Sequence, residues 1–459
     1  MKRFWFLLAL VAFYSPALVA QEQDELLADN DVLLADDDEA NLDEESDLIT
    51  ESGGEITLES RFFQDDKKSK TDDYGIGTYF RLQQGIEYDW LSTNLRVAGR
   101  VDSVDKDRNL VYFEEAWVQA QYLFLNLKVG SQLFNWSATE AFHPAEIINA
   151  RNFDSNLENA EKIGTLAVSL EALLGDFSVS GYYFPYYQLP NYPGTSSRLQ
   201  FYEIPDGQAL GSALKIDQDG NISSDEYGHQ YGGRVRYSGG SFDLTFHYLE
   251  ILSNIQPLPA VNLATSELQL MYPRLKQAGS TLQWAIGPWL VKSEVAYRHY
   301  PALASVIQTN YVSFVNGSVV PFTGPPADHV VAAFGLEYGF DIGDGAELTF
   351  LTEGQFLGGE KIDRTTAAQL DIFQADILGG VRLALNDLLD RALLVSVIGD
   401  LEREQELLLN VSYSQRLTEQ WSIALGGRAV YAPTDAAVKS GLQPLHESNQ
   451  IYLNLSRYF

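Results

Sequence analysis

Hydrophobic and polar residues alternate along most of the chain from residue 55 onward. In segment 91–102, Leu95 belongs to the apolar set and Arg96 to the polar set, and their neighbours continue the alternation. The same period of two returns in segments 241–249, 405–416 and 419–431. Because successive side chains of a β-strand point to opposite faces, the pattern predicts strands with one apolar and one polar face.

About 18 segments of this kind can be counted, each close to the roughly 10 residues that a tilted strand needs to cross a bilayer. They begin near residues 55, 75, 92, 110, 124, 162, 175, 229, 240, 277, 289, 329, 345, 376, 391, 405, 419 and 447. Every second connection is tight, as from Tyr88 to Ser92, whereas the others are mostly longer, as at 134–161 and 187–227. The sequence therefore predicts an all-β fold, a transmembrane antiparallel up-and-down β-barrel of about 18 strands, with 16 as the alternative. Its short turns would be periplasmic and its long loops extracellular.

The N-terminal part of the chain does not follow this pattern. Residues 1–20 begin with a basic stretch, continue with an apolar run and end in small residues, which is typical of a secretory signal peptide. Between Gln21 and Glu55 there are 15 acidic and no basic residues. Such dense like charge predicts an acidic, disordered periplasmic segment over 21–54. The barrel would then occupy 55–459.

The C-terminus has the form of an assembly signal. Its final residues, IYLNLSRYF, alternate between apolar and polar and end on an aromatic side chain. This resembles the signal by which the barrel assembly machinery recognises outer-membrane barrels, with Leu455 and Phe459 as assembly-signal residues on the face toward lipid. Together with the leader, it predicts a protein of the outer membrane of a Gram-negative bacterium, in contact with membrane lipid and lipopolysaccharide.

Composition narrows the range of functions. The chain has no cysteine, which excludes disulfides and thiolate chemistry. Its formal net charge of -32 argues against nucleic acid as a partner. The sequence contains no P-loop, Gly-x-Ser-x-Gly or His-Glu-x-x-His motif, and its 6 histidines lack metal-ligand spacing. We therefore expect no enzyme activity, no cofactor and no metal site.

The polar face of the predicted strands would line the barrel lumen. Our pore-lining candidates are Arg81, Arg96, Arg100, Glu115, Lys128, Arg234, Arg236, Asp243, Lys292 and Arg298. The wider polar set contains acidic and basic positions in equal number. A lumen with charges of both signs favours a channel whose transverse field selects solutes. A salt-bridged structural wall that carries little flux is the alternative.

One stretch, 111–164, resembles a known family. It contains Glu115-Ala116, Gly130-Ser131-Gln132, Trp136, Pro144, Asn149 and the run from Arg151 to Asp154. In this order and spacing the stretch resembles the alginate-export type of outer-membrane barrel and its porin-like relatives. The resemblance covers about 50 residues, and it departs from the family at Ser137, where relatives often have Gly, and at Asn152, where an acid is expected. It implies a conduit for an anionic polysaccharide with an electropositive lumen.

A loop of this length after the fifth strand is predicted to fold into the barrel mouth and narrow it. Its constriction-loop residues would be Arg151, Asp154, Glu161 and Lys162, whereas an external loop packed on its neighbours is the alternative. Because a polyanion exporter should have a lumen of one sign, the mixed charges favour a porin-like channel for small hydrophilic or charged solutes. The anionic-polysaccharide conduit and a plugged structural or adhesive barrel remain as alternatives.

Overall fold

The structure is a computed structural model of the chain. It describes residues 48–459 apart from 66–71, 156–159, 195–196, 201–210, 218, 224–226, 256, 302–309, 316–317, 322–326, 361, 363–366, 368–369, 404–405 and 434–440. The predicted signal peptide over 1–20, and most of the predicted acidic segment over 21–54, lie outside the described residues.

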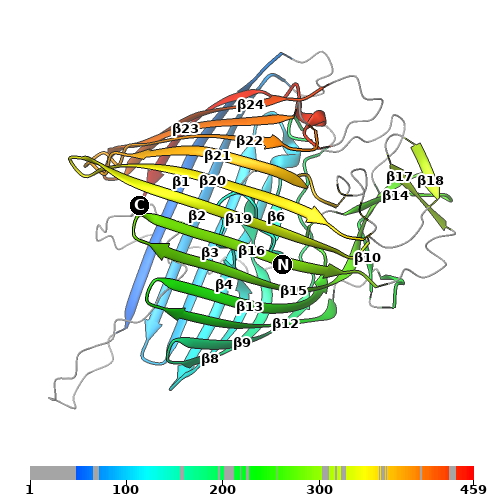
Figure 1. Cartoon of the computed structure of the whole chain (residues 1–459), viewed down its shortest axis with the longest axis horizontal. Helices are drawn as coiled ribbons and strands as arrows, with labels where there is room; N and C mark the ends of the chain where they lie inside the picture. The colour runs from blue at the N-terminus through cyan, green and yellow to red at the C-terminus, as the bar shows by residue number, and fades with distance from the viewer. Residues whose placement is uncertain are drawn as a thin grey trace, which may run out of the picture.

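Within the described residues, 18 antiparallel strands close into one barrel (Figure 1). They are β1 (Ile49–Phe63), β2 (Tyr74–Tyr88), β3 (Leu91–Asp102), β4 (Leu110–Tyr122), β5 (Leu125–Gln132), β8 (Thr165–Leu174), β9 (Phe177–Tyr186), β12 (Tyr227–Gly239), β13 (Phe242–Leu252), β15 (Leu268–Ile286), β16 (Trp289–His299), β19 (His329–Gly343), β20 (Ala346–Gly358), β21 (Ala375–Ala384), β22 (Ala392–Asp400), β23 (Leu407–Thr418), β24 (Trp421–Tyr431) and β25 (Gln450–Tyr458). Each pairs with the next, and β1 pairs with β25 to complete the ring. The predicted barrel is confirmed with its larger strand count.

The first strand begins earlier than the sequence predicts. Residues Ile49 to Gly54, assigned above to the acidic segment, pair with the periplasmic half of β2, and Gly54 also exchanges backbone hydrogen bonds with Phe459. The pairing gives these backbone groups partners at the point where the barrel closes. The barrel therefore starts at Ile49 rather than at residue 55, because the acidic composition of this stretch hides its strand.

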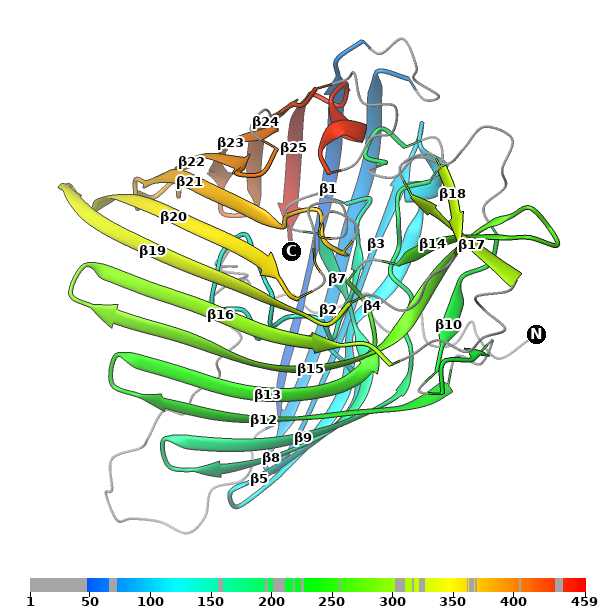
Figure 2. The same ribbon diagram turned by 45° about the vertical axis from the view of Figure 1, so that its right-hand side comes forward.

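The tight turns depend on left-handed backbone conformations. Gly175, Gly240 and Gly287 have φ of 67°, 62° and 60°, and Asp89 and Leu123 have φ of 47° and 54°. Positive φ at the centre of a two-residue hairpin matches the right-handed twist of the flanking strands. These turns keep neighbouring strands in register at one end of the barrel, whereas the long connections gather at the other end (Figure 2).

The outer surface is apolar. Exposed side chains on it include Leu95, Phe113, Phe246, Phe334 and Ile451. Exposed aromatic residues cluster near the tight turns, among them Tyr88, Trp90, Tyr122, Phe177 and Trp289. An apolar belt bordered by an aromatic girdle is the surface that a barrel presents to lipid and its interface. Within the described part of the chain, no helix is long and apolar enough to span a membrane.

The connections beyond the tight-turn end contain most of the remaining structure. β15 extends past the barrel wall and pairs there with β10 (Leu214–Ile216) and β14 (Leu258–Asn262), and β14 continues the small sheet through β17 (Tyr311–Val315) to β18 (Ser318–Pro321). β11 (Ile222–Ser223) pairs with β10. Two 3-10 turns, η1 (Lys106–Arg108) and η2 (Gln443–Leu445), lie in other connections.

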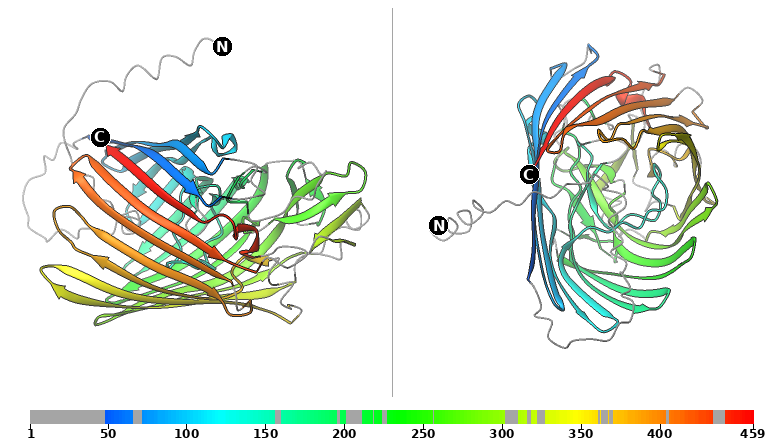
Figure 3. Two further views of the ribbon diagram at one scale, coloured as in Figure 1. Left: turned by 90° about the horizontal axis from the view of Figure 1, so that it is seen from above. Right: turned by 90° about the vertical axis from the view of Figure 1, so that its left-hand side faces the viewer.

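The connection between β5 and β8 lies inside the ring of strands. Figure 3 (right) shows the ring end-on, with this segment inside it. It contains the short strands β6 (Ala150–Asn152) and β7 (Glu161–Ile163), which pair as a hairpin. The buried core of the molecule is formed where this segment meets the inner face of the wall, so the fold places its packing in the lumen rather than between sheets.

Candidate functional site

The segment 133–164, called here the inner loop, is closed at its base by one asparagine. The side-chain amide of Asn149 donates to the carbonyl oxygens of Gln132, at 2.9 Å, and Ile163, at 3.0 Å. Its side-chain oxygen accepts from the backbone N–H of Phe134 at 2.7 Å. Because one buried side chain satisfies three backbone groups from both ends of the inner loop, the loop leaves the wall in a fixed direction.

The inner loop crosses to the opposite wall, where Glu294 of β16 holds it. This carboxylate is 0% exposed. One oxygen accepts from the backbone N–H groups of Ala138 and Thr139 at 2.7 and 3.1 Å, and the other accepts from Ala145 at 2.9 Å. A buried carboxylate is stable only when such donors replace its water shell. Glu294 therefore acts as an anchor for the loop rather than as a charge that faces solute.

Ser137, one of the two positions where segment 111–164 departs from the alginate-export pattern, adds to this anchor. The hydroxyl of Ser137 donates to Glu294 at 2.6 Å and lies 2.6 Å from Nδ1 of His143. Because the single hydroxyl proton goes to the carboxylate, Nδ1 of His143 is the donor in the second contact. Burial lowers the pKa of His143 to about 3, so the ring is neutral. A glycine at residue 137 would lack this hydroxyl.

The tip of the inner loop is held by a second carboxylate. Glu353 of β20 accepts from the backbone N–H groups of Glu140, at 2.6 Å, and Ala141, at 2.8 Å. Beside it, Lys292 of β16 forms ion pairs with Glu140 and with Glu337, the latter at 2.6 Å. The wall therefore meets both the backbone and the side chain of the tip.

Apolar packing fixes the inner loop on both sides of the lumen. Phe142 at the tip packs in a buried cluster with Leu378, Ile398 and Leu408 of the far wall. Near the base, Phe134 and Trp136 pack with residues of β9, β13 and β15. The burial of large side chains on this scale stabilises a folded segment by several kcal/mol, at roughly 1.5–3 kcal/mol for each. The loop is thus a built element inside the barrel and not an external one.

The predicted constriction residues separate into two groups. Arg151 and Lys162 form ion pairs with Glu146, and Glu161 forms one with Arg100 at 2.5 Å, and all three side chains keep some contact with solvent. Asp154 is different, because it is 1% exposed and its carboxylate accepts from Ser197. Our expectation that Asp154 faces solute is therefore wrong, and burial raises the pKa of its carboxyl to about 6.

Asn152, the second position where segment 111–164 departs from the alginate-export pattern, also has a role in the inner loop. Its amide donates to Glu161 at 3.1 Å, and its oxygen accepts from the side chain of Asn191 at 2.8 Å. An aspartate at residue 152 would place a second carboxylate beside Glu161 and would have no proton to donate. The asparagine thus joins the hairpin to the next long connection without adding charge.

The wall made by β2, β3 and β4 carries two arginines that solvent reaches. The side chains of Arg81 and Arg96 are 27% and 26% exposed. Arg81 lies 3.1 Å from Glu114, and Arg96 lies 3.9 Å from Glu114 and 3.8 Å from Glu115. A break in the register between β3 and β4 follows Arg96, so that both glutamates point inward. Strict alternation puts Glu114 on the lipid face, which is why the sequence did not identify it.

Three residues that we predicted to line the pore are buried instead. Arg100 lies between Glu59, at 2.8 Å, and Glu161, at 2.5 Å, and so joins the wall to the inner loop. Arg298 donates to the carbonyl of Pro144 at 3.1 Å, and Lys292 lies beneath the loop tip. These three expectations are wrong in the same way: each side chain points inward as predicted, but the inner loop covers it.

The other pore-lining candidates keep partial contact with solvent. Lys128 lies over the ring of Trp117, and Arg234 lies over that of Trp136, with the cation 4.1 and 5.3 Å from the ring centre. Arg236 and Asp243 are paired across β12 and β13 at 3.3 Å. Of the two predicted assembly residues, Phe459 is exposed at the seam, and Leu455 of β25 pairs with β1 and β24.

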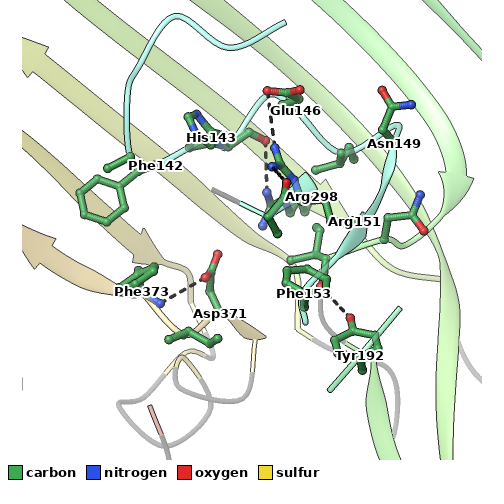
Figure 4. Close-up of a pocket in the computed structure, with 17 residues that line it drawn as sticks. Phe142, His143, Glu146, Asn149, Arg151, Phe153, Tyr192, Arg298, Asp371 and Phe373 are labelled. Carbon is green, nitrogen blue, oxygen red and sulfur yellow. Dashed lines mark hydrogen bonds and ion pairs between the residues drawn. The ribbon is translucent and has the colours of Figure 1, made fainter. Parts of the chain in front are cut away.

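A recess of about 160 Å³ lies where the inner loop, the long connections and the end of β16 meet (Figure 4). Its walls include Phe142, His143, Arg151, Phe153, Tyr192, Arg298, Asp371 and Phe373. Among the described residues, no group of three or more acidic or histidine side chains could hold a metal ion. The recess therefore offers charge and aromatic surface, and both signs of charge are present.

Comparisons with known proteins establish the fold. No family model matches the chain, and no curated protein matches it. Among solved structures, Pseudomonas aeruginosa OccK8 (OprE) has a TM-score of 0.50 at 11% identity, over 89% of this chain and 98% of that one. P. aeruginosa OccK11 (OpdR) follows with a TM-score of 0.45 at 11% identity, over 89% and 96%. The similarity to OccK8 shows the fold of an outer-membrane porin.

The closed barrel and its outer surface indicate the location, whereas the comparisons show no family. A large closed barrel with this fold and an apolar outer belt points to the bacterial outer membrane. At an identity near one residue in ten, these structures show the fold and no family, so the similarity of segment 111–164 to the alginate-export type stays a resemblance.

Proposed function

We propose that this protein is a porin-like channel that lets small hydrophilic solutes diffuse across the outer membrane. One observation carries the proposal. Arg81 and Arg96 point into the barrel, yet each keeps about a quarter of its side-chain surface accessible. In a plugged barrel these charges would be packed as tightly as Glu294. Partial exposure of interior charges is what a water-filled lumen produces.

The inner loop supports the proposal by giving the channel a constriction. It is anchored at mid-wall through Glu294 and Glu353 and packed at both sides. A lumen of 18 strands is wide enough to pass water and ions without such a loop. A loop fixed across it narrows the path, so that size and charge at this level would select solutes.

The charge pattern favours a small-solute channel over the conduit for an anionic polysaccharide. Arg81, Arg96 and Arg100 all have carboxylate partners on the same wall or on the inner loop. Each arginine and its carboxylate partner neutralise each other, so these pairs leave little net field to attract a polyanion. The resemblance of segment 111–164 to the alginate-export type supports the alternative, and ion selectivity separates the two.

The proposal is tested by reconstituting the barrel in a planar bilayer and measuring conductance and reversal potential in a salt gradient. We expect stable channels with at most modest ion selectivity. Strong anion preference would favour the polysaccharide conduit. A folded, heat-modifiable barrel that never conducts would contradict the channel and point to a plugged barrel.

A further inference from the structure

The recess above the inner loop contains buried polar groups whose bonding is incomplete. Arg298 is 2% exposed; its Nε donates to Gln277 at 3.0 Å and its Nη2 to the carbonyl of Pro144 at 3.1 Å. Among the described residues, its Nη1 has no hydrogen-bond partner. A buried guanidinium nitrogen without a partner is costly, so it calls for an explanation.

Asn254, which also lines the recess, has a buried acceptor without a donor in the described structure. Its amide nitrogen donates to the carbonyl of Ile148 at 2.9 Å, which fixes its orientation. Its side-chain oxygen is buried and, within the described part of the chain, accepts no hydrogen bond. One wall of the recess therefore offers an unused cationic donor, and another offers an unused neutral acceptor.

A carboxylate completes the set. Asp371 lines the recess, and its carboxylate accepts from the backbone N–H of Phe373 at 3.2 Å. Burial raises the pKa of Asp371, and the nearby charge of Arg298 only partly offsets that rise. In the described structure no ion pair joins the two side chains. Figure 4 shows Asp371 and Arg298 on the same recess, with the aromatic residues around them.

The rest of the lining is aromatic. Phe153 and Tyr192 stack with their ring centres 4.9 Å apart, and Phe142 and Phe373 meet edge to face at 5.6 Å. An apolar body would be enclosed between these two pairs of rings. A cation, an anion and apolar walls in one recess fit a ligand that carries both charges on an apolar frame.

We propose that this recess binds small zwitterionic solutes with an apolar body, of which an aromatic amino acid is the simplest. The solute's carboxylate would accept from Nη1 of Arg298. Its ammonium group would donate to Asp371 and to the side-chain oxygen of Asn254. A simple anion would leave Asp371 unpaired and a simple cation would leave Arg298 unpaired, so neither satisfies both groups.

This inference rests on the proposed function for its consequence, because a solute held above the inner loop matters to transport only if the barrel conducts. The recess lies on the side of the long connections, directly against the loop. A bound zwitterion would therefore lie against the inner loop and, in a conducting barrel, reduce the current. Binding itself needs no conduction, which allows the two proposals to be tested apart.

The experiment uses the whole barrel with L-phenylalanine as the probe and two matched analogues, 3-phenylpropanoate and 2-phenylethylamine, which each carry one of its charges. Single-channel current is recorded with the probe on the long-loop side, and heat of binding is measured in detergent. We expect L-phenylalanine to bind about tenfold more tightly than either analogue, since each analogue loses one charged hydrogen bond. Asp371→Asn should lower the affinity for L-phenylalanine about tenfold and leave the affinity for 3-phenylpropanoate unchanged.

Two further variants and one neutral probe, maltose, complete the test. Asp176→Asn, in a tight turn at the far end of the barrel, should leave binding unchanged. Arg298→Gln should weaken L-phenylalanine and 3-phenylpropanoate together but not 2-phenylethylamine, and its conductance without ligand reports whether the inner loop stays in place. Equal binding of the analogues or of maltose, or no heat with any probe, would overturn the zwitterion site. Binding without conduction would instead contradict the channel and leave the site standing.

Discussion

Two parts of the inner wall use charged residues in different ways. On β2, β3 and β4, the carboxylates of Glu114 and Glu115 are met by arginine side chains that solvent still reaches. On β16 and β20, Glu294 and Glu353 are buried and are met by backbone N–H groups of the inner loop. The first wall keeps charged side chains in contact with solvent, and the second is an attachment for a chain segment.

The difference shows that an inward position does not make a residue pore-lining. A carboxylate paired with a flexible side chain can exchange that partner for water or a solute ion at small cost. A carboxylate that accepts several backbone hydrogen bonds cannot exchange its partners in this way, because every N–H group that it releases would be left without an acceptor inside the protein. Carboxylates bonded to backbone N–H groups therefore hold the inner loop in place. Carboxylates paired with side chains remain able to exchange their partners for water or ions.

Removal of the main anchor should have the largest effect. Glu294→Ala leaves the N–H groups of Ala138, Thr139 and Ala145 without their acceptor. We expect a loss of about 3–5 kcal/mol in unfolding free energy and a clear increase in single-channel conductance as the inner loop leaves the lumen. Urea titration and bilayer recording measure the two effects.

The matched control is Glu347→Ala. This glutamate lies on the inner face of β20 and accepts from the hydroxyl of Thr349, and no contact with the inner loop is seen in the described structure. It should change stability by about 1 kcal/mol or less and leave the conductance near that of the unmodified protein. If both variants conducted alike, the two walls would not differ as we describe.

A buried arginine and a partly exposed one should respond differently to the same substitution. Arg100→Gln leaves Glu161 without its cation and Glu59 with Arg108 alone among the described residues, and we expect it to cost about 3 kcal/mol. Arg96→Gln removes a partly solvated charge, so it should cost about 1 kcal/mol or less and shift selectivity toward cations. Denaturant midpoints and reversal potentials compare them directly. Equal losses of stability would remove the distinction between solvated and buried arginines.

The smallest expected effect is a pH dependence at Asp154. Its folded pKa of about 6 lies above its ordinary value of 3.8, so the folded protein holds the proton more tightly than the unfolded chain does. Stability should therefore fall as the pH rises from about 4 to about 6, and Asp154→Asn should gain about 1–3 kcal/mol above that window. Unfolding of both proteins at pH 4 and pH 7.5 measures the gain. A variant that is less stable than the unmodified protein at pH 7.5 would show that this carboxylate is ionised and well paired.

Much of the fold could be predicted from the sequence. The period of two, repeated with tight and long connections in turn, was enough to give the barrel and its strand count, because register and turn geometry are local properties. The early start of β1 escaped notice because residues 49–54, which pair with β2, continue the acidic composition of the segment before them. Glu114 escaped notice because a bulge reverses its face.

The site was harder to predict for a physical reason. Alternation tells which side chains point inward, and it was right for Arg100, Lys292 and Arg298. It does not tell what lies on top of them. The inner loop contacts β16 and β20 across more than 140 residues of chain, as in the 156-residue separation of Ala138 and Glu294. Such contacts depend on how the loop folds, and no local pattern in the strands records them.

The central claim is that a water-filled path runs past Arg96 beside the inner loop. Because the chain has no cysteine, Arg96→Cys creates a unique thiol. We would record single-channel current while adding a cationic, membrane-impermeant methanethiosulfonate, with Leu95→Cys on the outer face as the control. The account predicts a stepwise change of conductance for Arg96→Cys and none for Leu95→Cys. A conducting barrel whose current is unchanged by modification at residue 96, or a folded barrel that does not conduct, would contradict it.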